Sequence, residues 1–267
     1  MAIGVVSGCP LRALGLQALA EAEGFPVAWI APTVAEALGR VRRQPPAVLL
    51  IDFALPDGSG PRLLHALRQE GIALDGFLLL ADPYPAGLAL AWKAGACAVL
   101  FTTLPLPLLR VRLRAALQGT LSWHPADRCR AQAWWVRFGE PWAALSPRQR
   151  AVALGIARGW SDKEIAQALR RRPTSIRTHL RWLLHRLGLP DRVALRQWVR
   201  SGCLDDPYIA PLLDLEDPPW LGEDRLGGGV PPKMRKARPL FPPKMRKRAE
   251  GGEDKMRSGI PFRGARP

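Results

Sequence analysis

The segment from Leu145 to Val199 constrains this chain most strongly, because its apolar and basic residues recur in different helical phases. Its pattern predicts four short helices separated by turns. One face of the predicted third helix carries Arg177, Arg181 and His185, with Thr178 beside them. A helix with one basic and one apolar face can pack on a core and lie in the major groove of DNA. The apolar stripe that we expect to be buried consists of Ile176, Leu180, Leu183, Leu184 and Leu187.

Positive charge is concentrated in this segment and at the C-terminal end of the chain. The formal net charge is +16, and residues 143–200 carry 13 basic and 3 acidic side chains, a net charge of +10. Residues 225–267 carry the same numbers, whereas residues 201–224 carry 7 acidic side chains and no basic one. Basic surfaces attract phosphate backbones. The charge distribution therefore predicts double-stranded DNA as a partner.

Several classes of protein are disfavoured by what the sequence lacks. No apolar run reaches the roughly 18 residues of a membrane span, and the first residues do not have the pattern of a signal peptide. The four cysteines form neither a CxxC motif nor a Cys/His cluster. We therefore expect a cytoplasmic protein with no membrane partner, metal, cofactor or disulfide framework. The cysteines are Cys9, Cys97, Cys129 and Cys203.

Short apolar runs alternate with amphipathic segments through the first 120 residues. Runs this short and apolar suit strands that are covered on both faces, and five β–α units in succession predict an α/β doubly wound, five-stranded parallel sheet. The last segment, Leu108–Leu117, has an apolar face that covers the sheet or, alternatively, forms a dimer surface. The predicted strands are Ile3–Val6, Val27–Ile30, Ala47–Phe53, Phe77–Leu80 and Ala98–Phe101.

Asp52 ends the third apolar run, within VLLIDFALPDGSG, and the sequence KAGACAVLF leads to the end of the fifth run. These features resemble the receiver domain of bacterial response regulators, over about the first 120 residues. The resemblance implies that Asp52 stands where receivers carry the aspartate that accepts a phosphoryl group.

The positions that support phosphorylation in receivers differ in this chain. Ser7 and Gly8 replace the acidic pair that binds Mg²⁺, Ala81 replaces a Ser or Thr, and Thr102 replaces a Lys. One carboxylate is a poor Mg²⁺ site, and phosphoryl transfer depends on neutralising oxygen charge. We therefore predict a degenerate, or pseudo-, receiver in which Asp52 is structural and the domain dimerises or binds a protein partner. Phosphorylation of Asp52 is the alternative.

Composition divides the chain into four parts. A receiver-like domain (1–120) is followed by a Trp-rich linker (121–142), a helical domain (143–204) and a low-complexity tail (205–267). Within this linker, Asp127–Phe138 is a candidate helix, and the tryptophans should pack on a domain or on a second subunit. The tail is acidic and then basic, and its repeated PPKMRK and low apolar content predict disorder.

The helical domain resembles the LuxR/FixJ-type helix-turn-helix. LSPRQ begins it, GWSDKEIA is close to the family pattern G-x-S-N-K-E-I-A, and TSIRTHL matches T-V-K-x-H-L with conservative changes. By this likeness Arg177, Thr178 and Arg181 lie at base edges or adjacent phosphates, and Lys163, Ser175 and His179 at phosphates. His179 as a packed core residue is an equal alternative. The full set of implied DNA-binding residues is Lys163, Thr174, Ser175, Arg177, Thr178, His179 and Arg181.

Two further features of the helical domain bear on its function. The turn before the third helix reads Arg170-Arg171-Arg172-Pro173, where the family has a Gly and then an apolar residue. An arginine there is strained if the backbone must be left-handed. The last predicted helix, Val193–Val199, contains Leu195, Trp198 and Val199, and by resemblance it could form a homodimer on a two-fold symmetric site.

These observations favour a dimeric, DNA-binding transcription regulator, not an enzyme, whose receiver-like domain does not respond to phosphate in the usual manner. Two alternatives stay open. One is a response regulator that is switched by phosphorylation of Asp52. The other is an adaptor that works through protein contacts and binds DNA weakly and without specificity.

Overall fold

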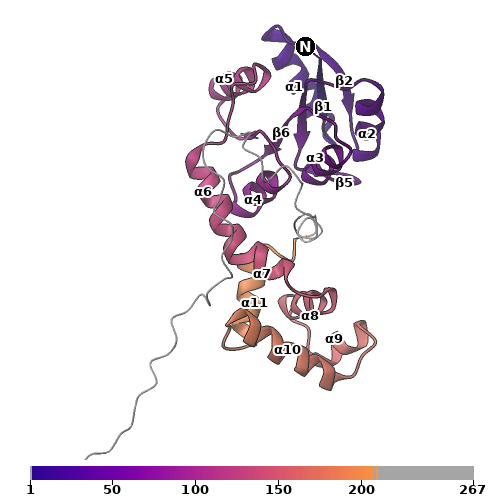
Figure 1. Cartoon of the computed structure of the whole chain (residues 1–267), viewed down its shortest axis with the longest axis vertical. Helices are drawn as coiled ribbons and strands as arrows, with labels where there is room; N and C mark the ends of the chain where they lie inside the picture. The colour runs from indigo at the N-terminus through magenta and orange to yellow at the C-terminus, as the bar shows by residue number, and fades with distance from the viewer. Residues whose placement is uncertain (1, 207–208, 210–267) are drawn as a thin grey trace, which may run out of the picture. The chain divides into compact units, whose positions relative to one another are not determined.

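The computed structural model describes residues 2–206 and residue 209 (Figure 1). In the first 120 residues, strands and helices alternate as the sequence predicts. The strands of the main sheet are β1 (Ile3–Val6), β2 (Val27–Ala31), β3 (Val48–Asp52), β6 (Asp75–Leu80) and β7 (Ala98–Phe101). The helices between and after them are α1 (Pro10–Ala22), α2 (Val34–Arg43), α3 (Gly60–Gln69), α4 (Pro85–Lys93) and α5 (Leu106–Leu117).

The five strands pair in parallel in the order β2-β1-β3-β6-β7, which confirms the predicted doubly wound sheet. Both faces are covered. Side chains of α1 and α5, including Leu16 and Leu113, pack with Val5 and Leu50 on one face. Residues of α2, α3 and α4 pack on the other face. Leu113 is fully buried, so the apolar face predicted for Leu108–Leu117 serves to cover the sheet.

A small antiparallel hairpin follows β3 and was not predicted. It consists of β4 (Ala54–Leu55) and β5 (Gly58–Ser59). Ser59 then caps α3, because its hydroxyl accepts a hydrogen bond from the backbone N–H of Arg62.

The segment after the sheet is helical and is rich in buried aromatic side chains. It contains α6 (Pro125–Trp134), the π-helix η1 (Trp135–Gly139) and α7 (Glu140–Ala143). The predicted helix at Asp127–Phe138 is therefore present, but it begins two residues earlier and ends as a π-helix. Helix α6 packs against α4. Trp134, Trp135 and Trp142 are buried, as expected for tryptophans that pack on a domain.

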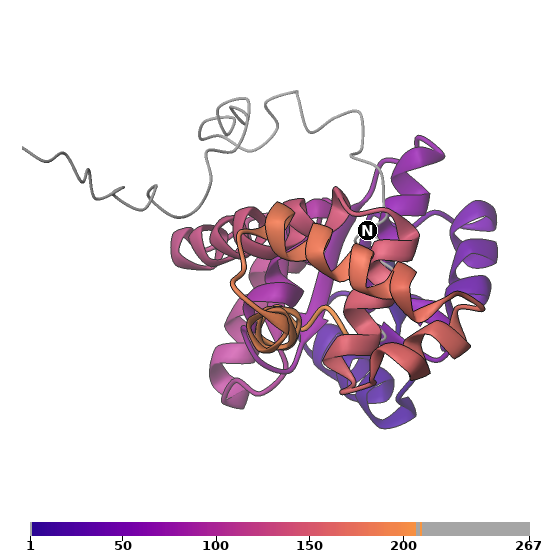
Figure 2. The same cartoon turned by 90° about the horizontal axis from the view of Figure 1, so that it is seen from below.

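Four helices form the helical domain, and Figure 2 shows them from below in pink to orange. They are α8 (Pro147–Ala157), α9 (Asp162–Ala168), α10 (Pro173–Leu187) and α11 (Arg192–Ser201). Helices α8 and α9 each begin with a capping box, formed by Ser146 with Gln149 and by Ser161 with Glu164. The four predicted helices are confirmed.

The predicted disorder of residues 205–267 lies outside the described residues, apart from positions 205, 206 and 209. Among the residues that are described, no helix is long and apolar enough to cross a membrane.

Candidate DNA-binding surface and the Asp52 site

Helix α10 presents the two faces that the sequence predicts. Ile176 and Leu183 are fully buried, and Leu180, Leu184 and Leu187 pack against the same core. The helix ends at Gly188, whose left-handed φ of 66° favours glycine. The apolar stripe is thus confirmed, and it fixes which residues of α10 point away from the core.

The outward face of α10 is basic. The side chain of Arg177 is 72 % exposed, and Arg181 is also exposed. The hydroxyl of Thr178 donates to the backbone carbonyl of Thr174 at 3.2 Å, so its proton is engaged within the helix, and its methyl group stays available for an outside contact. The other predicted DNA-binding residues follow the same trend, with Lys163 and Thr174 exposed and Ser175 half-buried.

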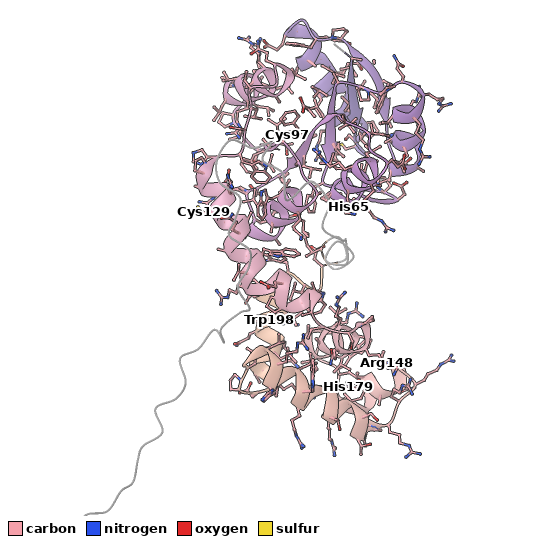
Figure 3. The ribbon with its side chains drawn as sticks, viewed as in Figure 1. His65, Cys97, Cys129, Arg148, His179 and Trp198 are labelled. Carbon is pink, nitrogen blue, oxygen red and sulfur yellow. The ribbon has the colours of Figure 1, made fainter. Side chains whose placement is uncertain are left out.

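His179 is half-buried at the edge of a hollow of about 310 Å³. Arg148 of α8 and Arg171 of the turn also line this hollow, together with apolar residues such as Val152 and Ile176. Figure 3 labels Arg148 and His179 in this domain. The imidazole is neither sealed in the core nor fully exposed. Its position therefore does not decide between a core residue and a phosphate contact.

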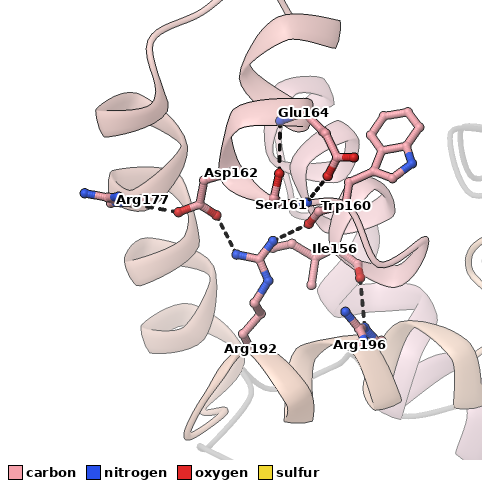
Figure 4. A network of polar contacts seen from close by, with 8 residues as sticks. All are labelled: Ile156, Trp160, Ser161, Asp162, Glu164, Arg177, Arg192 and Arg196. Carbon is pink, nitrogen blue, oxygen red and sulfur yellow. Dashed lines mark hydrogen bonds and ion pairs between the residues drawn. The ribbon is translucent and has the colours of Figure 1, made fainter.

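A polar network joins α9 to the two helices that follow it (Figure 4). The Asp162 carboxylate accepts hydrogen bonds from Arg177 and Arg192, and Arg192 also donates to the carbonyl of Trp160. At the start of α9, the backbone N–H of Ser161 donates to Glu164 and holds the pKa of that carboxyl below its usual range. Sequence reasoning identified the capping box but not the contacts of Asp162.

The turn between α9 and α10 is left-handed at Arg170, where φ is 51°. A side chain at such a position meets the backbone unfavourably, and glycine does not. The predicted strain at this arginine is therefore present. The next residue, Arg171, lines the hollow beside α10 and does not supply the small core contact that an apolar residue would make.

Most apolar side chains of helix α11 pack inside the chain. Leu195 and Val199 are fully buried. Trp198 packs on Phe138 and Trp142, with ring centroids 5.6 Å and 6.4 Å apart. These three side chains belong to the core of the domain and its junction with the linker, whereas Val193 at the start of the same helix is 60% exposed. Dimerisation through α11 stays a prediction.

Asp52 lies at the end of β3 with only 2 % of its surface exposed. The Ser7 hydroxyl donates to Oδ2 at 2.5 Å, and Nη1 of Arg12 donates to Oδ1 at 2.8 Å. Arg12 belongs to the first turn of α1 and is partly exposed. Both carboxylate oxygens are thus engaged by the chain itself, and sequence reasoning missed the arginine.

The groups around Asp52 do not fit Mg²⁺, which prefers several oxygen ligands in an octahedral shell. Asp52 is the one carboxylate in the arrangement, and a guanidinium already contacts it. Across the parts of the chain that the structure describes, no group of three or more His, Cys, Asp or Glu side chains is placed to hold a metal ion. The Thr103 hydroxyl donates to the Ala81 carbonyl at 2.6 Å.

Comparison with known proteins agrees with this geometry. A family model described as "Bacterial regulatory proteins, luxR family" matches residues 143–199. The chain is 27% identical to the nitrate/nitrite response regulator protein NarP of Escherichia coli over 193 residues, which covers 71% of this chain and 90% of NarP. The chain has the organisation of a NarL-like response regulator. Its helical domain is a LuxR-type helix-turn-helix.

Other relatives support the NarL-like organisation. The probable transcriptional regulatory protein NarL of Mycobacterium tuberculosis is 28% identical over 182 residues, which covers 64% of this NarL-like chain and 80% of the relative. A structure of RcsB from Salmonella enterica serovar Typhimurium, bound to promoter P1flhDC with a phosphomimetic, aligns with a TM-score of 0.51. It is 21% identical and covers 75% of this chain and 98% of RcsB, which shows the shared fold.

Proposed function

We propose that this NarL-like regulator binds a specific double-stranded DNA sequence as a homodimer, through the outward face of α10. The observation that carries the proposal is the exposure of Arg177 and Arg181 beside the methyl group of Thr178, on a helix whose opposite face is buried. Arginine can read guanine with two parallel hydrogen bonds, and a threonine methyl can contact thymine.

We further propose that the receiver-like domain is not controlled by ordinary phosphorylation of Asp52. Ser7 and Arg12 occupy both oxygens of this buried carboxylate. A phosphoryl donor would have to displace Arg12 and react without a fitting metal site. The domain instead supports dimerisation or contact with a protein partner, and the regulator carries out no catalysis.

Fluorescence anisotropy tests the DNA-binding proposal. The full chain is titrated onto DNA from its own upstream region and onto a shuffled duplex, each at two salt concentrations. We expect a preference for the upstream duplex that persists at the higher salt and is lost in Arg177→Ala/Arg181→Ala. Equal binding to both duplexes that collapses with salt and ignores the substitutions would favour the non-specific adaptor.

A second experiment tests the role of Asp52. The protein is incubated with Mg²⁺ and either acetyl phosphate or beryllofluoride, and its oligomeric state is measured by light scattering. We expect no change. A change that is absent in Asp52→Asn would establish the phosphorylation switch and would contradict the pseudo-receiver.

A further inference from the structure

The carboxylate of Asp162 connects three helices of the DNA-binding domain. It lies at the first helical position of α9, and its two oxygens contact different helices (Figure 4). Oδ1 accepts a hydrogen bond from Nη1 of Arg192 in α11 at 2.5 Å, and Oδ2 accepts one from Nε of Arg177 in α10 at 3.4 Å. An exposed arginine of the DNA-facing surface is thus paired with an acidic residue of its own domain.

Asp162 is held more firmly than an ordinary surface carboxylate. Its side chain is only 20 % exposed, and the Arg192 that binds it is anchored a second time on the carbonyl of Trp160. Ser161 directly before it caps α9 through the backbone N–H of Glu164. The position of the negative charge is therefore set by the fold, whereas the Arg177 side chain beside it is 72 % exposed.

Two physical effects follow for DNA binding. First, a fixed anion draws Arg177 toward one orientation through Nε, and this leaves the terminal amino groups of the guanidinium for an outside acceptor. Second, the same anion repels DNA phosphates that approach Arg177 when the protein is bound at a shifted position along the duplex. Discrimination between partners often depends on such a repulsive element as well as on attractive contacts. Phosphate contacts add affinity without sequence information.

We propose that Asp162 is a positioning residue that raises the sequence selectivity of Arg177 by restraining its contacts with phosphates. The inference rests on the proposed function of α10. The family pattern has an uncharged Asn at this place, so the negative charge is a departure of this chain, and Asp162→Asn removes it while keeping the shape of the side chain.

The test compares affinities for two duplexes by fluorescence anisotropy with the full chain. One duplex is selected by the wild-type protein from a random library, and the other is its shuffled version. In Asp162→Asn we expect tighter binding to the shuffled duplex and a selectivity ratio that falls about 2- to 5-fold, as expected for loss of an exposed ion pair. Glu36→Gln is the matched control, because it removes the same charge from an exposed pair in α2.

A double-mutant cycle separates positioning from a general charge effect. In the Arg177→Ala background, Asp162→Asn should leave the selectivity ratio unchanged. The Nε–H proton of Arg177, followed by NMR in the free protein, should exchange with water faster in Asp162→Asn than in wild type. This second measurement does not depend on DNA.

The outcomes distinguish this inference from the proposed function. Wild-type protein that binds both duplexes equally would contradict both. If the wild-type protein is selective, three results would overturn this inference alone. Asp162→Asn could keep the selectivity ratio, tighten binding to both duplexes equally, or have the same effect in the Arg177→Ala background.

Discussion

The indole of Trp198 packs against the phenyl ring of Phe138, with ring centroids 5.6 Å apart. Trp198 belongs to α11 and Phe138 to η1, so the core of the DNA-binding domain continues into the segment that precedes it. Trp142 completes the group at 6.4 Å from Trp198. The aromatic side chains of the linker thus extend the core of the four short helices.

Removing this indole should destabilise the protein. We expect Trp198→Ala to lower the free energy of unfolding by about 2 kcal/mol, less than for a fully buried aromatic residue because Trp198 is half-buried. Urea denaturation followed by circular dichroism measures the change. Trp182→Ala is the control, because Trp182 is 40% exposed and the Arg186 guanidinium lies 4.9 Å from its ring centroid. A cost equal to that control would contradict the role of the junction.

The left-handed turn at Arg170 allows a substitution that should stabilise the protein. Arg170→Gly should raise the free energy of unfolding by about 0.5–1 kcal/mol, because glycine adopts the positive φ of 51° without strain. Thermal unfolding provides the measurement. Arg171→Gly removes the same charge from the next position, which does not have a positive φ, and it should not stabilise. Similar gains from both variants would point to relief of charge repulsion and not of strain.

The contact between Arg12 and Asp52 should contribute to the stability of the receiver-like domain. We expect Arg12→Ala to cost about 1–2 kcal/mol, because it leaves a buried carboxylate with Ser7 as its one remaining side-chain partner among the described residues. Arg40→Ala breaks an exposed pair with Glu36 and should cost less than about 0.5 kcal/mol. Chemical denaturation of both variants measures the difference in unfolding free energy. Equally small losses of stability would show that Asp52 tolerates removal of the Arg12 contact.

Lys93 in α4 gives a prediction about pH. Burial lowers the pKa of Lys93 to about 8, although Glu140 acts to raise it, and the ammonium lies 4.3 Å from the centroid of the Trp135 ring. Below about 8 the lysine is charged in both states, so the cost of burying the charge opposes folding in full. At pH values between about 8 and the ordinary pKa of 10.5, Lys93 is mainly neutral in the folded state and still charged in the unfolded state.

The contribution of Lys93 to stability should therefore rise with pH through that window. We expect the stability of wild-type protein, minus that of Lys93→Met, to increase from neutral pH to the upper end of the window. Urea denaturation at several pH values provides the curve. A flat difference would mean that the ammonium is solvated and titrates normally.

Much of the fold was predictable because the relevant signals are local. The strands of the sheet are short apolar runs covered on both faces, and the helices of the DNA-binding domain have clear caps at Ser146 and Ser161. The β4–β5 hairpin escaped prediction because each strand has only two residues. Runs of that length carry no periodicity.

The candidate sites were predictable only in part. The outward residues of α10 follow from helical spacing, but the partners of Asp52 and Asp162 do not. Arg12 lies 40 positions from Asp52 in the sequence, and nothing in the pattern of α1 distinguishes it from a solvated arginine. The packing of Trp198 depends on where the linker lies, so its partners Phe138 and Trp142 could not be read from the pattern of α11.

The engagement of Asp52 by Ser7 and Arg12 also bears on how such a regulator could receive information. A protein without a covalent on–off mark can still change its occupancy of DNA, because occupancy follows from concentration and affinity by mass action. On the proposal that Asp52 is not phosphorylated, we expect the cellular level of this protein to determine how much of its target is bound. Synthesis and proteolysis would then carry the signal that a kinase and phosphatase carry elsewhere.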